Sequence, residues 1–183
     1  MASMRHLGNE RRRGPTPRGF TLIELMVAIM VLGILLGVAV PSFRDAALSS
    51  RLTAYANDLV ASAQIARSEA IKRNAPVTLC ASADGAVCEE DGGWEVGWIV
   101  LTADGAVLQR EQPLSDEFRF TETSGGLTEI TFPATVVGVT PASFTVCRGS
   151  PVGKQERVVT ISVSGNASVT RTTEGDCPEA EGP

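Results

Sequence analysis

The sequence predicts an α+β fold in which a long N-terminal helix packs on an antiparallel β-sheet. An apolar stretch near the N-terminus is long enough to span a membrane, and the residues after it keep a helical spacing of apolar side chains. From Pro76 onward the pattern changes to short β-like runs separated by Gly, Asp and Ser. The 183 residues have room for one domain of ordinary size and an appendage, but not for two full domains.

Charge is distributed unevenly along the chain. Residues 1–19 contain five arginines and one glutamate, a net charge of +4, whereas residues 20–183 contain 11 basic and 20 acidic residues, a net charge of −9. The single histidine is His6, so residues 20–183 cannot form a Ser-His-Asp triad or a His-ligated metal site. An enzyme would depend on carboxylates alone, and the sequence places no pair of them together. We therefore predict no enzymatic activity, no metal and no cofactor.

The apolar segment covers residues 20–40, and its only charged residue is Glu24. At about 1.5 Å per helical residue, it matches the hydrocarbon core of a bilayer, roughly 30 Å thick. Because the arginines precede it, the positive-inside bias places the N-terminus in the cytoplasm and the chain after Pro41 across the membrane. A secretory signal peptide is the alternative. Against it, the apolar run is long and a carboxylate at membrane depth is costly.

Residues 42–73 are expected to continue as an amphipathic helix. Apolar side chains recur at three- and four-residue steps, at Leu48, Leu52, Tyr55, Leu59, Ala63, Ala66 and Ala70. This stripe is expected to pack on the globular core; a groove for a partner helix is the alternative. Pro41 lacks an N–H and should kink or interrupt the long helix. The sequence Asn74-Ala75-Pro76 should end it.

Eight short strands are expected after Pro76. The predicted ranges are 77–81, 95–101, 106–109, 118–123, 128–132, 143–147, 157–162 and 167–172. Residues 102–105 and 164–166 contain the Gly and Asn that hairpin turns favour. Trp94 and Trp98 are expected on one face of a strand, packed in the core.

All four cysteines lie on the translocated side of the apolar segment, where an oxidising compartment favours disulfides. Four cysteines allow three pairings. We favour Cys80–Cys88, which closes a short loop, and Cys147–Cys177, which ties the C-terminal tail to the sheet. Zinc is the competing interpretation, but no CxxC motif or histidine accompanies these cysteines.

The residues Arg18-Gly19-Phe20-Thr21-Leu22-Ile23-Glu24-Leu25 resemble the class III signal of type IV prepilins and type II secretion pseudopilins. The resemblance implies that a prepilin peptidase cleaves between Gly19 and Phe20 and that Phe20 is then N-methylated. Glu24 would become the fifth residue of the mature chain. In a filament its carboxylate is expected to pair with the α-amino group of a neighbouring Phe20 and so to set the register. The expected regions are a leader (1–19), an apolar transmembrane or assembly helix (20–40), an amphipathic helix (41–75) and a periplasmic β-rich domain (76–183).

The later part of the chain resembles the GspH/FimT family of minor pilins and pseudopilins. The resemblance is carried by the stretches 67–73, 77–80, 94–100 and 144–147 and by Cys88, Cys177 and Pro178. It implies a pilin-like fold and a FimT-like minor pilin of a type IV pilus, with a GspH-like pseudopilin of type II secretion as the alternative. The protein would sit N-in as a single-pass protein of the bacterial inner membrane before it joins a pilus or pseudopilus. Its expected partners are other pilins or pseudopilins, the prepilin peptidase and the inner-membrane assembly platform.

DNA binding in natural transformation is a further hypothesis. Some FimT-like pilins use a Gly-Arg-x-Arg motif in the last hairpin, but here the matching residues read Gly165-Asn166-Ala167-Ser168 and both arginines are absent. The basic residues that remain nearby as DNA contacts are Arg148, Lys154, Arg157 and Arg171. Four scattered cations on an acidic chain form a poor binding surface for phosphates. The acidic stretch 88–93 also suggests Ca²⁺, but it lacks the alternating ligand spacing of a calcium loop.

Overall fold

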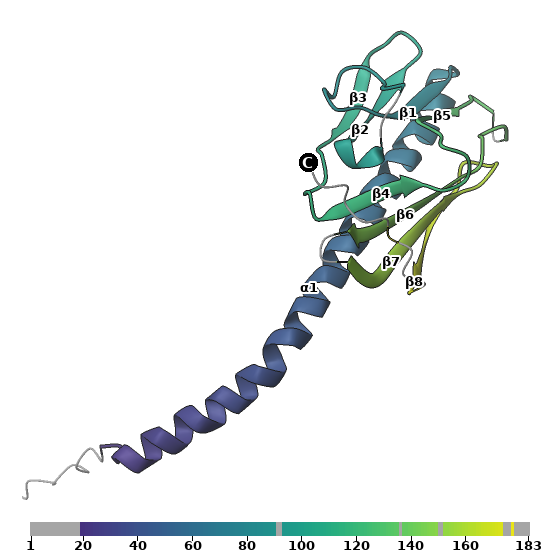
Figure 1. Ribbon diagram of the computed structural model, residues 1–183. Helices are drawn as coiled ribbons and strands as arrows, with labels where there is room; N and C mark the ends of the chain where they lie inside the picture. Colours follow the sequence, from purple (N-terminus) through teal and green to yellow (C-terminus); the bar gives the residue numbers. More distant parts are fainter. Residues whose placement is uncertain (1–18, 91–92, 136, 150–151, 174–176, 178–183) are drawn as a thin grey trace, which may run out of the picture. The chain divides into compact units, whose positions relative to one another are not determined.

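The computed structural model describes residues 19–90, 93–135, 137–149, 152–173 and 177. It divides the chain into two compact units, with the boundary between Phe43 and Arg44. One helix, α1 (Leu22–Arg73), contributes to both units (Figure 1). The helix includes Pro41 without a break, so the predicted interruption is wrong, and the other predicted effect, a kink, stays a prediction. Proline removes one backbone donor from the helix, and the helical conformation nevertheless continues through it over a span of 52 residues.

In the N-terminal unit, Thr21 caps the helix. The backbone N–H of Glu24 donates to Thr21 Oγ1 at 3.3 Å, as expected where Thr precedes Glu by three residues at a helix start. An 18-residue window of α1 reaches a mean hydropathy of 2.7 with none of it buried inside the structure. By length and composition, this part of α1 can cross a membrane.

Residues 44–73 of α1 belong to the globular unit and end as predicted. Asn74 takes a left-handed conformation at φ 49°, and the Ala75 N–H donates to the Ala70 carbonyl at 3.2 Å. Five members of the predicted apolar stripe are fully buried, and Leu48 and Tyr55 pack against the core from its margin. The buried members are Leu52, Leu59, Ala63, Ala66 and Ala70. The stripe therefore packs on the core, and the alternative of a groove for a partner helix is not needed.

The predicted fold class, a long N-terminal helix packed on antiparallel β-structure, is confirmed, and the strands form two antiparallel sheets of four. The first sheet has the order β3-β2-β1-β5 and the second β4-β6-β7-β8, and Figure 1 shows residues 44–73 of α1 lying along both. The strands are β1 (Val77–Ala81), β2 (Trp98–Thr102), β3 (Val107–Glu111), β4 (Phe118–Glu122), β5 (Glu129–Phe132), β6 (Ala142–Gly149), β7 (Val152–Ile161) and β8 (Ala167–Thr172). Both predicted hairpin turns are present, and they connect β2 to β3 and β7 to β8.

The predicted strand at 95–101 starts later than expected. Trp94–Val96 form the short helix η1, and only Trp98 onward joins the sheet as β2. Gly97 separates the two with φ +102°, and a Cβ on it would lie 2.6 Å from the Glu111 carbonyl oxygen. Only glycine fits this turn and this close approach, so the two tryptophans lie on different elements.

The core fills the space between α1 and the two sheets with aromatic and aliphatic side chains. Trp94 stacks edge-on against Phe144 at 4.8 Å between ring centroids, and Trp98 lies 5.5 Å from Phe120. Each indole N–H has an acceptor: Trp94 donates to the Leu127 carbonyl and Trp98 to Ser62 Oγ at 2.9 Å. Both tryptophans are 1% exposed, so the prediction that they are core residues is confirmed.

Candidate functional site

The residues of the processing motif lie at the accessible start of the described chain. Gly19 and Phe20 precede α1 outside any regular element, and 86% of Phe20 is exposed. An accessible, unstructured peptide bond before a helix is suited to entry into a protease. Cleavage between Gly19 and Phe20 and methylation of Phe20 stay predictions.

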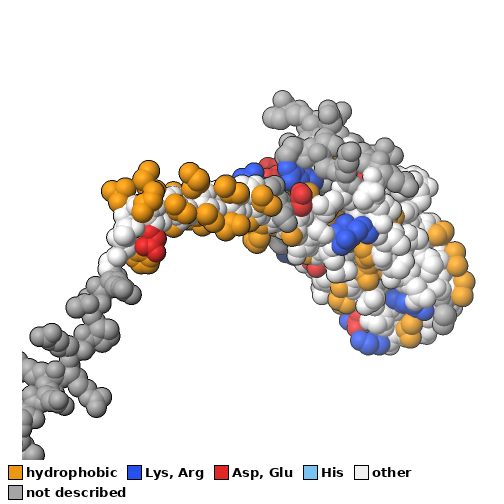
Figure 2. All heavy atoms as spheres, turned by 90° about the horizontal axis from the view of Figure 1, so that it is seen from below, with side chains coloured by type: hydrophobic (Ala, Val, Ile, Leu, Met, Phe, Trp, Pro, Cys, Tyr) orange, Lys and Arg blue, Asp and Glu red, His pale blue; other side chains and the backbone are white. Residues whose placement is uncertain are grey.

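Glu24 lies on the first turn of α1, exposed and flanked by apolar side chains. In the described part of this single chain, its carboxylate belongs to neither of the two ion pairs, which both involve Glu69. Apolar side chains surround it along residues 22–40, and Figure 2 shows them covering this part of α1. A carboxylate in such surroundings is costly without a cation. Inside an apolar assembly this carboxylate therefore needs a cation, which the ion pairs of the described residues do not supply.

The structure contains both disulfides that we favoured. Cys80–Cys88 closes the loop after β1, and Cys147–Cys177 joins β6 to the C-terminal segment. The structure describes no free cysteine. Among the residues that it describes, no group of three or more His, Cys, Asp or Glu side chains is placed to hold a metal ion. Asp91 and Gly92 of the acidic stretch lie outside the described residues.

Arg157 is buried, which corrects its prediction as a DNA contact. Its side chain is 2% exposed and points from β7 toward α1. Nε donates to Thr53 Oγ1 at 3.0 Å, and Nη2 donates to Ser49 Oγ at 2.7 Å and to the Ser49 carbonyl at 3.2 Å. Nη1 donates to the Glu156 carbonyl at 2.7 Å. Each of the three guanidinium nitrogens thus donates to a partner within the protein, and the side chain is not displayed at the surface for a phosphate.

The other three predicted DNA contacts do not form one surface with Arg157. Arg171 on β8 is exposed and lies opposite Arg157, to which its strand is paired. Arg148 on β6 is partly buried, and its Nε has no hydrogen-bond partner in the structure. The side chain of Lys154 lies outside the described residues. Only Arg171 is therefore shown with its guanidinium at the surface. Arg157 no longer counts among the predicted DNA contacts, because it is buried.

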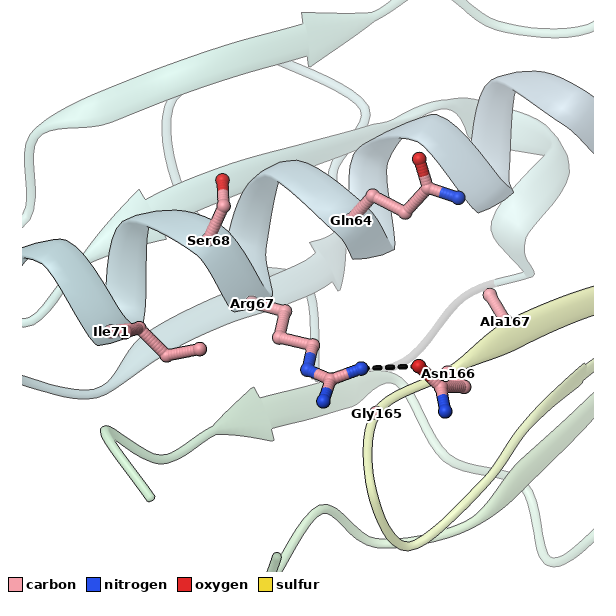
Figure 3. Close-up of a pocket in the computed structure, with 7 residues that line it drawn as sticks. All are labelled: Gln64, Arg67, Ser68, Ile71, Gly165, Asn166 and Ala167. Carbon is pink, nitrogen blue, oxygen red and sulfur yellow. Dashed lines mark hydrogen bonds between the residues drawn. The ribbon is translucent and has the colours of Figure 1, made fainter. Parts of the chain in front are cut away.

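A shallow cleft of about 300 Å³ lies at the tip of the hairpin between β7 and β8. Figure 3 shows Arg67 reaching from α1 to the turn, where its Nη1 donates to Asn166 Oδ1. Gly165 adopts φ +73°, and a Cβ on it would touch Arg67 and Phe132 at 3.3 Å. This is the turn in which the Gly-Arg-x-Arg motif is absent. Arg67 of α1 is the cation here, and it is used to hold the turn against the helix.

Two carboxylates at the edge of the first sheet have raised pKa values. Burial raises the pKa of Asp58 on α1. Burial and the charge of Asp58 raise the pKa of Glu111, at the end of β3, in spite of a backbone hydrogen bond from Gln112. The two acids thus belong to different elements, α1 and β3, and interact through their charges. Their like charges disfavour the ionised form of Glu111, so the pair is destabilising when both carboxylates are charged.

A third carboxylate organises the turn between β4 and β5. Glu122 accepts hydrogen bonds from the backbone N–H groups of Ser124, Gly125, Gly126 and Leu127. Burial acts to raise the pKa of Glu122, but these bonds and the Ser124 hydroxyl outweigh it, so that the pKa is lowered. The carboxylate thus substitutes for an anion bound in a turn.

Sequence reasoning missed the roles of Arg157, Asp58 and Glu122. Each role depends on which element packs against the side chain. The alternation within β7 offered one usable signal, because Arg157 occupies the same face as Val159 and Ile161, both fully buried. That pattern places the arginine on the core side of the strand. The alternation within β7 could not predict that Arg157 binds Ser49 and Thr53 on the helix.

Comparison with known families and proteins gives a consistent result. The model of the family described as "Type II transport protein GspH" matches residues 55–166, and that of the "Prokaryotic N-terminal methylation motif" matches residues 16–40. A crystal structure of the type IV minor pilin FimU of Pseudomonas aeruginosa is similar, with a TM-score of 0.52 and 25% identity. The match covers 66% of this chain and 89% of the FimU chain.

Two curated proteins are similar over shorter stretches. "Pilin-like protein PilA1" of Thermus thermophilus is 42% identical over 71 residues, and the "Type IV major alpha-pilin" of Moraxella bovis is 43% identical over 44 residues. The matches cover 39% and 24% of this chain and 44% and 28% of these relatives, so the chain spans less than half the length of each. The matched methylation motif includes both the processing motif and the apolar part of α1 up to Val40. The chain belongs to the GspH family of minor pilins and type II secretion pseudopilins, which are structural subunits and not enzymes.

Proposed function

We propose that this protein is a FimT-like minor pilin of a type IV pilus. It is made as a single-pass inner-membrane precursor, N-in, with its globular unit in the periplasm. The peptidase cleaves between Gly19 and Phe20 and methylates Phe20. The assembly platform then moves the subunit into the filament through the apolar part of α1. The observation that carries this proposal is the exposed apolar surface of residues 22–40, which lies within the matched methylation motif.

An exposed apolar helix of this length needs either lipid or other helices around it. Burial of apolar surface contributes about 25 cal/mol per Å², so α1 leaves the bilayer only where similar helices replace the lipid. Glu24 then pairs with the α-amino group of a neighbouring Phe20, which supplies the cation that this carboxylate needs in apolar surroundings. Similarity to FimU favours the pilus as the destination.

The second candidate is a minor pseudopilin of a type II secretion system. One specific observation favours it: the family model that matches residues 55–166 is described by its role in type II transport. Both systems would use the leader, the helix and Glu24 in the same way. The neighbour of the subunit in the filament therefore distinguishes them, and the fold does not.

In-cell photo-crosslinking tests the proposal. A photoreactive amino acid replaces Val27, whose side chain is 53% exposed on α1, and mass spectrometry identifies the captured neighbour. We expect a type IV pilus subunit. A probe at Thr131, an exposed position on β5, serves as the matched control away from the helix. Capture of a secretion pseudopilin would support the second candidate, and capture of neither would leave a simple membrane anchor.

A further inference from the structure

The cleft beside the turn between β7 and β8 contains an arginine without a carboxylate partner. Arg67 lies on α1, and the bond from its Nη1 to Asn166 Oδ1 is its one hydrogen bond among the described residues. Both ion pairs in this part of the chain use Glu69, which Lys72 and Arg73 hold at 2.9 and 3.0 Å. The residues that line the cleft include no acid. The positive charge of Arg67 is therefore available to a carboxylate from outside the described chain.

The contact with Asn166 fixes the orientation of the Arg67 guanidinium. A guanidinium only donates hydrogen bonds, so the amide atom facing it is oxygen, and the amide nitrogen of Asn166 points away from Arg67 (Figure 3). Because Nη1 makes this bond, the edge formed by Nε and Nη2 keeps its two parallel N–H groups. Neither of these two nitrogens is buried. Such an edge matches the two oxygens of a carboxylate, and a fork held in place loses less entropy when it binds.

Apolar side chains are also exposed around this turn. Ile71 lines the cleft and is exposed, and Val163, in the turn itself, is more than half exposed. The N–H groups of residues 138 and 139 donate to the Val163 carbonyl at 3.1 and 3.2 Å. These bonds hold the loop of Val137, another exposed valine, next to the turn. An arginine accompanied by exposed aliphatic side chains is typical of a surface that binds protein.

We propose that the cleft is a docking site for an aspartate or glutamate side chain of a neighbouring filament subunit. The carboxylate accepts hydrogen bonds from Nε and Nη2 of Arg67, and the apolar part of the partner covers Ile71. The inference rests on the proposed function, which supplies the neighbouring subunit. A polyanion such as DNA fits less well, because the cleft contains one cation and residues 20–183 carry a net charge of −9.

In-cell photo-crosslinking from the rim of the cleft tests the docking site. A photoreactive amino acid replaces Gln64, an exposed residue of the lining, and mass spectrometry identifies the captured peptide. We expect a peptide of another filament subunit that contains Asp or Glu. R67Q should lower capture about tenfold, since it removes both the charge and the fork. R73Q is the matched control on the same helix, because Arg73 pairs with Glu69, and it should leave capture unchanged.

Variants that separate charge from geometry sharpen the test. R67K keeps the charge without the fork and should lose less capture than R67Q. N166A keeps the guanidinium but releases its orientation, so it should lower capture as well. R67E should abolish capture, and replacement of the captured acid by arginine in the partner should restore it. Near-ultraviolet circular dichroism of the purified full-length variants in detergent establishes that each is folded.

Several results would overturn the inference. Capture that R67Q does not change, or a captured peptide without an acid, refutes the docking site. Capture of DNA by the Gln64 probe would identify a nucleic-acid surface instead. If the Val27 probe captures a filament subunit and the Gln64 probe captures none, this inference fails and the proposed assembly stands. If the Val27 probe captures no filament subunit, the proposed function fails, and the inference fails with it.

Discussion

Arg157 lies on the face of β7 that also carries the buried side chains of Val159 and Ile161. It joins β7 to α1 through Ser49 and Thr53. Its guanidinium also donates hydrogen bonds to the carbonyl oxygens of Glu156 and Ser49. A planar group with five fixed donors suits such a site, and an ammonium group cannot reproduce the geometry. The residue therefore holds helix and sheet together at the end nearest the apolar segment in sequence.

Replacement of Arg157 should destabilise the fold strongly. R157A leaves buried acceptors without donors and opens a cavity, so we expect a loss of about 2–4 kcal/mol. R157K should lose less, because it keeps the charge but not the fork. Thermal unfolding of the full chain in detergent measures both. R110A is the matched control, and an equal effect of R110A and R157A would contradict this role.

Asp58 should show the opposite behaviour, with its removal stabilising the protein. Since burial raises its pKa above the ordinary value of 3.8, the charged form is less favourable in the folded state than in the unfolded state. The penalty is fully present above the folded-state pKa and is absent below about pH 3.8, where both states are protonated. We expect D58N to stabilise the protein at pH 7 by about 0.5 kcal/mol, a size typical of partly exposed charges.

Chemical unfolding at pH 7 and at pH 3 measures this difference, which should disappear at the lower pH. Asp104 provides a control of opposite sign, because a hydrogen bond with the Thr102 side chain lowers its pKa. D104N should therefore destabilise the protein at pH 7. A destabilising D58N would show that the carboxylate has a favourable partner that outweighs its burial.

At the scale of elements, the two disulfides close loops of different length. Cys147–Cys177 encloses a separation of 30 residues and fixes the C-terminal segment to β6, whereas Cys80–Cys88 encloses a separation of 8. The entropy of the unfolded chain grows with the length of the loop that a disulfide closes. The longer connection should therefore contribute more to stability.

Removal of each disulfide by paired serine substitutions should rank the two. The chain-entropy relation gives losses of about 3.6 kcal/mol for Cys147–Cys177 and about 2.5 kcal/mol for Cys80–Cys88. Denaturant unfolding of the two double variants checks the order. A greater loss from the Cys80–Cys88 variant would show that strain or structure in the loop after β1 outweighs chain entropy.

At the scale of the whole molecule, an acidic globular unit is joined to an apolar helix that has no protein neighbour in the single chain. Large apolar side chains from Phe20 to Val40 are roughly half to four-fifths exposed. Such a surface is stable in lipid or among similar helices and not in water. The function of the molecule therefore depends on what surrounds α1.

Glu24 should matter for assembly and not for processing. We expect E24A and E24Q to be cleaved normally after Gly19, because the peptide bond and its glycine are unchanged. Both should be lost from filaments, since neither offers a carboxylate to a neighbouring α-amino group. Immunoblots of membrane and sheared-filament fractions measure cleavage and incorporation separately. Normal incorporation of E24Q would rule out the charge pair as the determinant of register.

Much of the fold could be predicted because its signals are local. The apolar run and its arginines determine where the helix starts, Asn74 and Pro76 determine where it ends, and alternation with Gly-containing turns marks the strands. The cysteine spacing favoured the two disulfides that the structure contains. Membership of the GspH family was suggested in the same way by the motif after Arg18 and the later stretches, and the family model confirms it.

The tertiary structure alone decided the features that depend on packing between distant segments. The strands divide into two sheets, η1 replaces the expected start of a strand, and Arg157 lies beneath α1 instead of facing solvent. Residues 104 positions apart along the chain, Arg157 and Thr53, share a hydrogen bond that no local pattern encodes. Local sequence determines the period and ends of an element, whereas burial of a charged side chain depends on which element covers it.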